Sequence, residues 1–375
     1  MNTTRQLYEV GQSIWYDNIE RRMLNNGDLA GMIARGEVRG VTSNPTIFMH
    51  AMTKAHDYDA SLTALARAGK TAEEIFWDLA IEDIQTATDL FRPLYEESKG
   101  GDGYVSLEVN PYLANDAAVT LAEVKRLWAL VNRPNLMIKI PATLEALPAI
   151  RDALAAGINI NITLIFSRAR YWAVMEAFLS GLESRLAAGQ PIDTIASVAS
   201  FFVSRVDTKV DARLNEIIAQ GGARAEEATA NLGRAAIANT RLAYNDYKII
   251  FNSERFAKLA AHGARAQRPL WASTSTKNPA YRDVVYVEEL IGRNTVNTIP
   301  SVTLAAFLDH GVVRPDSVEE GIPEAYQTFA RLETLGIVMS DVTHELEVEG
   351  VETFAGAWRT LLDAMETSRR AVTGE

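Results

Sequence analysis

Cysteine is absent from this 375-residue chain, and its absence excludes several classes of site at once. Without thiols there can be no disulfide, no cysteine nucleophile and no cysteine-ligated zinc. The absence of cysteine is typical of a cytosolic enzyme, so we expect a cytoplasmic protein. Only five histidines are present, and among them only His50 and His56 lie close together in the sequence. We therefore expect no metal site.

Long apolar runs and an excess of positive charge are missing as well. No apolar run reaches the roughly 18 residues that a membrane span needs. The first residues, MNTTRQLYEVGQSIW, lack the basic start and apolar stretch of a signal peptide. The net charge of −11 argues against a nucleic-acid interface. We expect neither a membrane nor a nucleic acid as a partner.

The chain shows no low-complexity linker, no strong charge block and no convincing short repeat. Its length is large for an ordinary domain but suits one large barrel. A chain of this size can bury an extensive core. We therefore expect a single domain over residues 1–375.

Short apolar runs alternate with longer helical stretches along the sequence. This alternation predicts parallel strands joined by crossover helices, and eight units predict an α/β protein with a (β/α)8 TIM barrel and additional helices. A doubly wound sheet is the alternative, although no Gly-x-Gly-x-x-Gly follows a strand. The predicted strands are 13–17, 38–43, 104–109, 136–140, 158–164, 196–203, 269–273 and 295–299. The predicted helical segments are 73–98, 115–131, 168–187, 206–219, 223–261 and a tail over about 323–372.

Three of the predicted strands carry polar residues on one face. Because side chains alternate across a strand, the runs 104–109, 136–140 and 158–164 each separate an apolar from a polar side. In a barrel the apolar side meets the helices, so the polar side points inward. An edge strand with a solvated face explains one such run but not three. The polar sides hold Ser106, Glu108, Lys139, Asn159, Asn161 and Thr163.

Lys139 is the most unusual of these residues, because it interrupts the apolar run Leu-Met-Ile-Lys-Ile. Lysine is almost never fully buried without a partner. One interpretation is a structural pair with a buried carboxylate. The other is a functional amine, since burial disfavours the charged form.

Five motifs resemble those of the transaldolase family and occur in the family's order. They are GVTSNPTIF (40–48), VSLEVNPYLA (105–114), LMIKIPAT (136–143), NITLIFS (161–167) and WASTSTKNP (271–279). The resemblance covers about residues 13–310, and the length is similar to that of the longer bacterial form. It implies a cofactor-free enzyme that transfers a dihydroxyacetone unit between sugar phosphates. The donor would be sedoheptulose 7-phosphate and the acceptor glyceraldehyde 3-phosphate, giving erythrose 4-phosphate and fructose 6-phosphate in the non-oxidative pentose phosphate pathway.

The resemblance implies roles for four catalytic residues. Lys139 would form a Schiff base with the ketone, and the iminium would accept electrons as the C3–C4 bond breaks. Asp17 would take the proton of the C4 hydroxyl. Glu108 would act through a water as general acid and base, and Thr163 would orient that water. A turn or capping role for Asp17 and a salt bridge between Glu108 and Lys139 are the structural alternatives.

The resemblance also implies a set of substrate-binding residues. Asparagine and hydroxyl side chains would bind substrate hydroxyls, Phe202 would form a wall, and the guanidinium of Arg205 would bind phosphate. A turn role for Asn44 and an ion pair of Arg205 with Asp207 or Asp211 are the alternatives. The implied residues with amide or hydroxyl groups are Thr42, Asn44, Asn161 and Ser200.

The sequence departs from the family pattern around the seventh strand. The arginine expected after the aromatic position is missing, and the run contains Ser273, Ser275 and Lys277 instead. We expect Lys277, with Ser275 or nearby backbone, to supply the second phosphate contact.

Other functions remain possible at this point. A fructose-6-phosphate aldolase or another lysine-dependent aldolase would release a free carbonyl product, and a non-catalytic barrel would only bind. The expected partners are small sugar phosphates, and both a monomer and a homodimer remain open.

Overall fold

The centre of the molecule is one parallel sheet of seven strands. The computed structural model describes residues 2–54 and 56–374. Neighbouring strands follow the order β1-β7-β6-β5-β4-β3-β2, and every pairing is parallel. This order lacks the reversal of a doubly wound sheet, so that alternative is wrong. The strands are β1 (Gln12–Tyr16), β2 (Val105–Glu108), β3 (Leu136–Pro141), β4 (Ile160–Ile165), β5 (Ser197–Phe202), β6 (Arg268–Ala272) and β7 (Thr295–Ile299).

One of the eight predicted strands, 38–43, is not a regular strand in the structure. Within it only Val41 forms isolated bridges, one to Tyr16 of β1 and one to Val105 of β2. Backbone hydrogen bonds still join this segment to both edge strands, from Tyr16 N to the Gly40 carbonyl and from Ser106 N to the Val41 carbonyl. Gly40 lies so close to Trp15 that a Cβ there would be 2.7 Å from the indole ring. The segment therefore lies between the two edges of a curled sheet, with too few paired residues for a strand.

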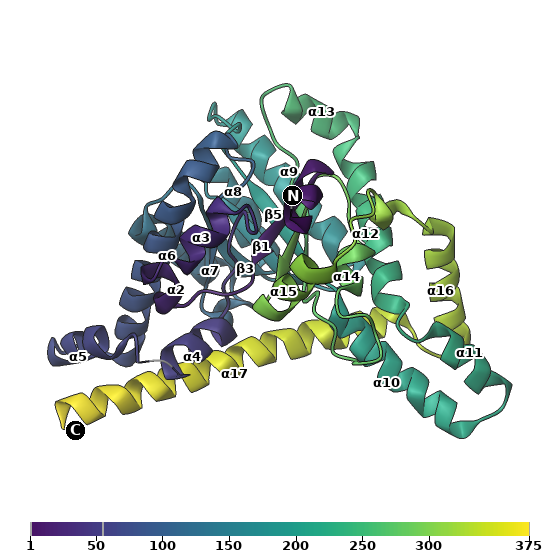
Figure 1. Cartoon of the computed structure of the whole chain (residues 1–375). Helices are drawn as coiled ribbons and strands as arrows, with labels where there is room; N and C mark the ends of the chain where they lie inside the picture. Colours follow the sequence, from purple (N-terminus) through teal and green to yellow (C-terminus); the bar gives the residue numbers. More distant parts are fainter. Residues whose placement is uncertain (1, 55, 375) are drawn as a thin grey trace.

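Helices connect the strands and surround the sheet, as Figure 1 shows. Some of them begin with a side-chain cap; Thr71 and Glu74 form a capping box at the start of the long helix α6. The helices are α1 (Thr3–Glu9), α2 (Arg21–Asn25), α3 (Asp28–Ala34), α4 (Pro45–Lys54), α5 (Asp59–Arg67), α6 (Ala72–Glu97), α7 (Ala117–Val131), α8 (Leu147–Ala155), α9 (Arg168–Ala187), α10 (Ser204–Gln220), α11 (Ala223–Asn231), α12 (Ala235–Phe251), α13 (Glu254–Ala260), α14 (Val285–Glu288), α15 (Ser301–His310), α16 (Ile322–Thr334) and α17 (Met339–Thr373), with short 3-10 helices η1 (Pro111–Leu113) and η2 (Ser317–Glu319).

Two predicted helical segments are divided in the structure. The segment 223–261 contains α11, α12 and α13, and a turn with Gly233 at φ +68° separates the first two. The predicted tail contains α16 and α17, separated by a turn with Gly336 at φ +82°. Glycine adopts this left-handed conformation without steric cost, so it ends a helix whose apolar pattern continues beyond it.

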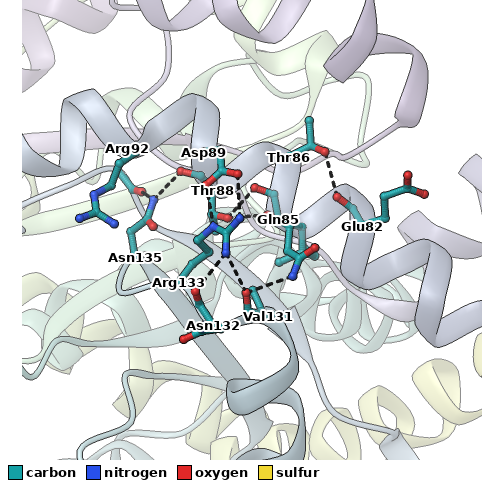
Figure 2. A network of polar contacts seen from close by, with 12 residues as sticks. Glu82, Gln85, Thr86, Thr88, Asp89, Arg92, Val131, Asn132, Arg133 and Asn135 are labelled. Atoms are coloured by element: carbon teal, nitrogen blue, oxygen red, sulfur yellow. Dashed lines mark hydrogen bonds and ion pairs between the residues drawn. The ribbon is translucent and has the colours of Figure 1, made fainter.

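The strand that carries Lys139 is fixed at its start by a polar network between α6, α7 and β3 (Figure 2). The Asn135 side-chain amide donates to the backbone carbonyls of Thr88 and Gly103, at 2.8 and 2.9 Å. Arg133 forms an ion pair with Asp89 of α6 at 2.6 Å. Asn135 is fully buried, so each of these bonds satisfies a carbonyl that water does not reach. The network sets the position of β3 relative to α6 and β2.

None of the helices in the described part of the chain is both long and apolar enough to cross a membrane.

Candidate active site

A cavity of about 310 Å³ opens where the strands end, and it collects most of the predicted site residues. All of them except Glu108 and Asn161 line it. The remaining lining residues, which the sequence did not indicate, are Thr46, Ile47, Ala272, Thr298, Pro300, Thr353 and Phe354. The carboxyl ends of barrel strands are the usual place for catalysis in such folds.

Lys139 and Glu108 form a buried ion pair at the bottom of this cavity. The two residues are in register on β3 and β2, and Lys139 Nζ lies 2.9 Å from Glu108 Oε2. Their side chains are only 5% and 2% exposed. Lys139 Nζ also donates to the Ser43 carbonyl at 3.1 Å. The predicted salt bridge is present, but Lys139 borders the cavity while Glu108 lies behind it.

Burial raises the pKa of Glu108 above its usual value, and the charge of Lys139 opposes this shift. Apart from the ion pair, neither Glu108 oxygen accepts a hydrogen bond from the described residues, and Thr163 Oγ1 has no partner there either. Unpaired buried polar atoms are uncommon. Beside Lys139 there is therefore hydrogen-bonding capacity that the rest of the described chain does not use.

Asp17 lies directly after β1 and is held by a chain of hydroxyls. Thr42 Oγ1 donates to Asp17 Oδ1 at 2.7 Å. Because that bond uses the hydroxyl proton of Thr42, Thr298 Oγ1 is the donor in its contact with Thr42 Oγ1, at 2.6 Å. The backbone N–H of Asp17 donates to the Ile299 carbonyl of β7. The next helix, α2, has Glu20 rather than Asp17 as its N-cap. The capping alternative for Asp17 is therefore wrong.

Asn161 and Asn44 have structural partners. Asn161 Nδ2 donates to Ser106 Oγ at 3.0 Å, and Ser200 Oγ donates to Asn161 Oδ1 at 2.7 Å. Asn161 is fully buried and lies behind Ser200, which lines the cavity. Asn44 accepts from the backbone N–H of Ile47 at the start of α4, so its turn role is real, and it lines the cavity too.

The cationic end of the cavity is built from α10 and the loop after β6. The Arg205 guanidinium stacks over Phe202 at 5.2 Å, and burial lowers the pKa of Arg205. Arg205 has no ion-pair partner within the described residues, so the predicted alternative pairing is not formed. Lys277 is exposed, and its Nζ donates to Ser275 Oγ at 3.0 Å. Ser273, at φ +56°, lies 3.0 Å from the hydroxyl of Ser204.

Comparison with known proteins agrees with this geometry. A model of the transaldolase/fructose-6-phosphate aldolase family matches residues 14–365. The chain belongs to this family. It is 51% identical to the transaldolase of Thermobifida fusca (strain YX) over 359 residues, 96% of each chain. It is 50% identical to the transaldolase of Saccharopolyspora erythraea, over 96% of this chain and 95% of that one. Transaldolase 1 of Streptomyces coelicolor is 48% identical over 373 residues, 99% of this chain and 96% of the other.

The family membership predicted from five motifs is thus confirmed. The motifs did not reveal Thr298 or Phe354 in this transaldolase-family cavity. Thr298 had a signal, because it is the second-last residue of the strand-like run TVNTI, just as Glu108, Lys139 and Thr163 are in their predicted strands. Phe354 had none, because it is an apolar residue on an amphipathic helix far along the chain.

The segment after β6, which carries Lys277 and continues into α14, is joined to α10 by two tyrosines. Tyr281 donates to Asp211 Oδ2 at 2.6 Å, and Tyr286 donates to Asp207 Oδ2 at 2.7 Å. Asp207 Oδ1 also accepts from the Ala236 N–H at 2.7 Å. Burial nevertheless raises the pKa of Asp207 to about 6. These bonds keep Lys277 near the helix that carries Arg205.

The raised pKa of Asp207 predicts a pH-dependent stability. Because the folded-state pKa lies above the unfolded value of 3.8, the folded state holds the proton more strongly. This stabilisation is full below pH 4 and is lost as the pH rises to about 6. Relative to Asp207→Asn, we expect the wild-type unfolding free energy to fall by about 2.4 kcal/mol between pH 4 and pH 7. Urea unfolding of both proteins at both pH values measures this, and parallel pH dependences would contradict it.

Proposed function

We propose that this chain is a transaldolase that transfers a dihydroxyacetone unit from sedoheptulose 7-phosphate to glyceraldehyde 3-phosphate through a Schiff base on Lys139. The observation that carries the proposal is a nearly inaccessible lysine that borders a polar cavity and touches one buried carboxylate. The names of the relatives, at about half identity over most of the chain, support the same activity.

The first half of the reaction forms the iminium. Glu108, 2.9 Å from Lys139 Nζ, takes the ammonium proton and leaves a neutral amine that attacks the ketone carbon. The carbinolamine then loses water, and Glu108 returns the proton to the leaving hydroxyl through a water that Thr163 orients. The unused hydrogen-bonding capacity of Glu108 and Thr163 supports this role.

The second half breaks and remakes the C3–C4 bond. Asp17 takes the proton of the C4 hydroxyl, the aldehyde leaves, and the electron pair moves into the iminium to give an enamine. Thr42 donates a hydrogen bond to Asp17 Oδ1 and so orients the carboxylate. The enamine then attacks the acceptor aldehyde, Asp17 returns the proton to the new hydroxyl, and hydrolysis releases fructose 6-phosphate.

We assign substrate recognition to the remaining lining residues. Asn44 and Ser200 bind substrate hydroxyls, and Asn161 holds Ser200 in place from behind. Arg205, which has no protein carboxylate of its own among the described residues, binds the phosphate. Lys277, with Ser275 beside it, supplies the second phosphate contact. Phe202 and Ser273 form the wall of the cavity between Arg205 and Lys277.

We also propose that residues 38–42 occupy the eighth strand position and close the sheet into a (β/α)8 barrel, because they are hydrogen-bonded to both β1 and β2. One apolar core extends from Leu7 to Met365, which supports a single domain.

Borohydride trapping tests the proposed function. Incubation of the protein with fructose 6-phosphate and borohydride should add reduced sugar units to Lys139 alone, as read by intact-protein and peptide mass spectrometry. Product analysis with and without an acceptor aldehyde separates transfer from an aldolase that releases free dihydroxyacetone. No adduct on active protein, or an adduct on another lysine, would refute the assignment.

Chelation is predicted to leave activity unchanged. The chain has no cysteine, and its described residues contain no group of His, Asp or Glu placed to hold a metal ion. The chemistry assigned to Lys139, Glu108 and Asp17 needs no Lewis acid. Activity is measured after dialysis against EDTA, with a dialysed but untreated sample as control. A loss that zinc or magnesium restores would contradict the mechanism.

A further inference from the structure

Helix α17 covers part of the cavity although it comes after every strand in the chain. It is the long yellow helix along the lower edge of the molecule in Figure 1, passing α10 and α4. Two of its residues, Thr353 and Phe354, line the cavity. Phe354 is 3% exposed, and its ring centroid lies 5.6 Å from Lys139 Nζ. The face of the Phe354 ring is therefore directed toward Lys139, the proposed nucleophile.

The position of Phe354 is fixed on both sides along the helix. One turn further, Trp358 packs edge-on against Phe76 of α6, with ring centroids 4.8 Å apart. One turn earlier, Gly350 lies against β4, where an added Cβ would be 3.0 Å from Leu164 Cδ2. The ring thus has little freedom to move away from Lys139.

Ion pairs add to this attachment at the other end of the cavity. Lys209 of α10 pairs with Glu345 and Glu349 at 2.9 and 2.5 Å. These pairs connect α17 to the helix that carries Arg205. The cover is therefore tied to both sides of the cavity.

We propose that Phe354 is the cover of the Schiff-base site, shielding the three-carbon intermediate from water so that it passes to an aldehyde and is not hydrolysed. This inference rests on the proposed function. The unwanted reaction has two steps. A proton first adds to the enamine carbon and restores the iminium, and water then adds to its C=N bond, releasing dihydroxyacetone and the free lysine amine.

A phenyl ring opposes each step in a different way. It takes up space that water would need in order to reach the enamine carbon. It also presents its negative face to the positively charged iminium and so stabilises that cation against the addition of water, and such a contact is stronger in a desolvated site. A leucine in the same place would keep part of the shielding but not the cation–π contact.

The test compares two variants of the same helix. Phe354→Ala removes the cover, whereas Leu361→Ala removes a fully buried apolar side chain of α17 that does not line the cavity. Free dihydroxyacetone and transfer product are measured with fructose 6-phosphate as donor at one fixed acceptor concentration. We expect Phe354→Ala to raise the ratio of hydrolysis to transfer by about tenfold or more, the size expected for a lost desolvated cation–π contact. Leu361→Ala should leave the ratio unchanged.

An unchanged ratio in Phe354→Ala, or an equal rise in Leu361→Ala, would overturn the inference. Borohydride trapping on wild-type Lys139 is run alongside, because its failure would instead refute the proposed function. If thermal melting shows that Phe354→Ala is not folded, Phe354→Leu is used in its place. We expect a smaller rise in that variant, and an unchanged ratio there also overturns the inference.

Discussion

Lys139→Arg is expected to abolish turnover and to form no borohydride-stable adduct. A guanidinium stays charged in proteins and cannot form an iminium. The arginine still places a cation near Glu108, so the buried carboxylate keeps a partner. The loss should be on the order of 10⁴-fold or more, as is found when a covalent nucleophile is removed.

The matched control is Lys125→Arg, because Lys125 is exposed on α7 and is not one of the residues that line the cavity. This variant should transfer dihydroxyacetone at the wild-type rate and be trapped on Lys139. Rates are measured by quantifying erythrose 4-phosphate, and thermal melting reports folding. Residual turnover in folded Lys139→Arg close to the wild-type rate would show that Lys139 is not the nucleophile.

Asp17→Ala and Glu108→Ala are expected to stop the reaction at different steps. Asp17 acts after the iminium has formed. With fructose 6-phosphate as donor, Asp17→Ala should therefore accumulate an adduct that carries the whole six-carbon sugar. Glu108 acts in forming and hydrolysing the carbinolamine, so Glu108→Ala should form any adduct slowly. Each variant should lose about 10²–10⁴ in rate, as is typical of a positioned general acid or base.

Intact-protein mass after reduction distinguishes these outcomes, because six-carbon and three-carbon adducts differ in mass. Asp17→Asn and Glu108→Gln serve as matched variants that keep side-chain shape. A three-carbon adduct formed by Asp17→Ala at the normal rate would show that Asp17 is not the cleavage base.

Local patterns in the sequence predicted the strands well where a strand pairs along its length. The alternating run around Lys139 predicted β3 and the direction of its polar side. Residues 38–43 were predicted as a strand too, but only Val41 forms bridges to its neighbours. Whether such a segment becomes a strand depends on how many of its residues the two edge strands β1 and β2 can pair with. The local sequence of the segment does not specify that number. Likewise, the long helical pattern at 223–261 did not reveal the breaks between its three helices.

The site was predictable to the extent that its residues lie at strand ends. Glu108 and Lys139 came from periodicity and the family motifs, and their register on β2 and β3 brings them together. Asn161 was expected in contact with substrate; it does not line the cavity, and it accepts a hydrogen bond from Ser200, which does. The contribution of α17 could not be read locally, since nothing in an amphipathic helix indicates which distant strand end it will cover.

The place of α17 in the chain has a consequence for the order of assembly. All seven strands precede it, so a nascent chain can form the Lys139–Glu108 pair before Phe354 has left the ribosome. On the proposed function, Lys139 is open to small carbonyl compounds during that interval. Docking of Trp358 against Phe76 ends this exposure. On the proposed function, the final helix therefore covers the nucleophile only when folding is nearly complete.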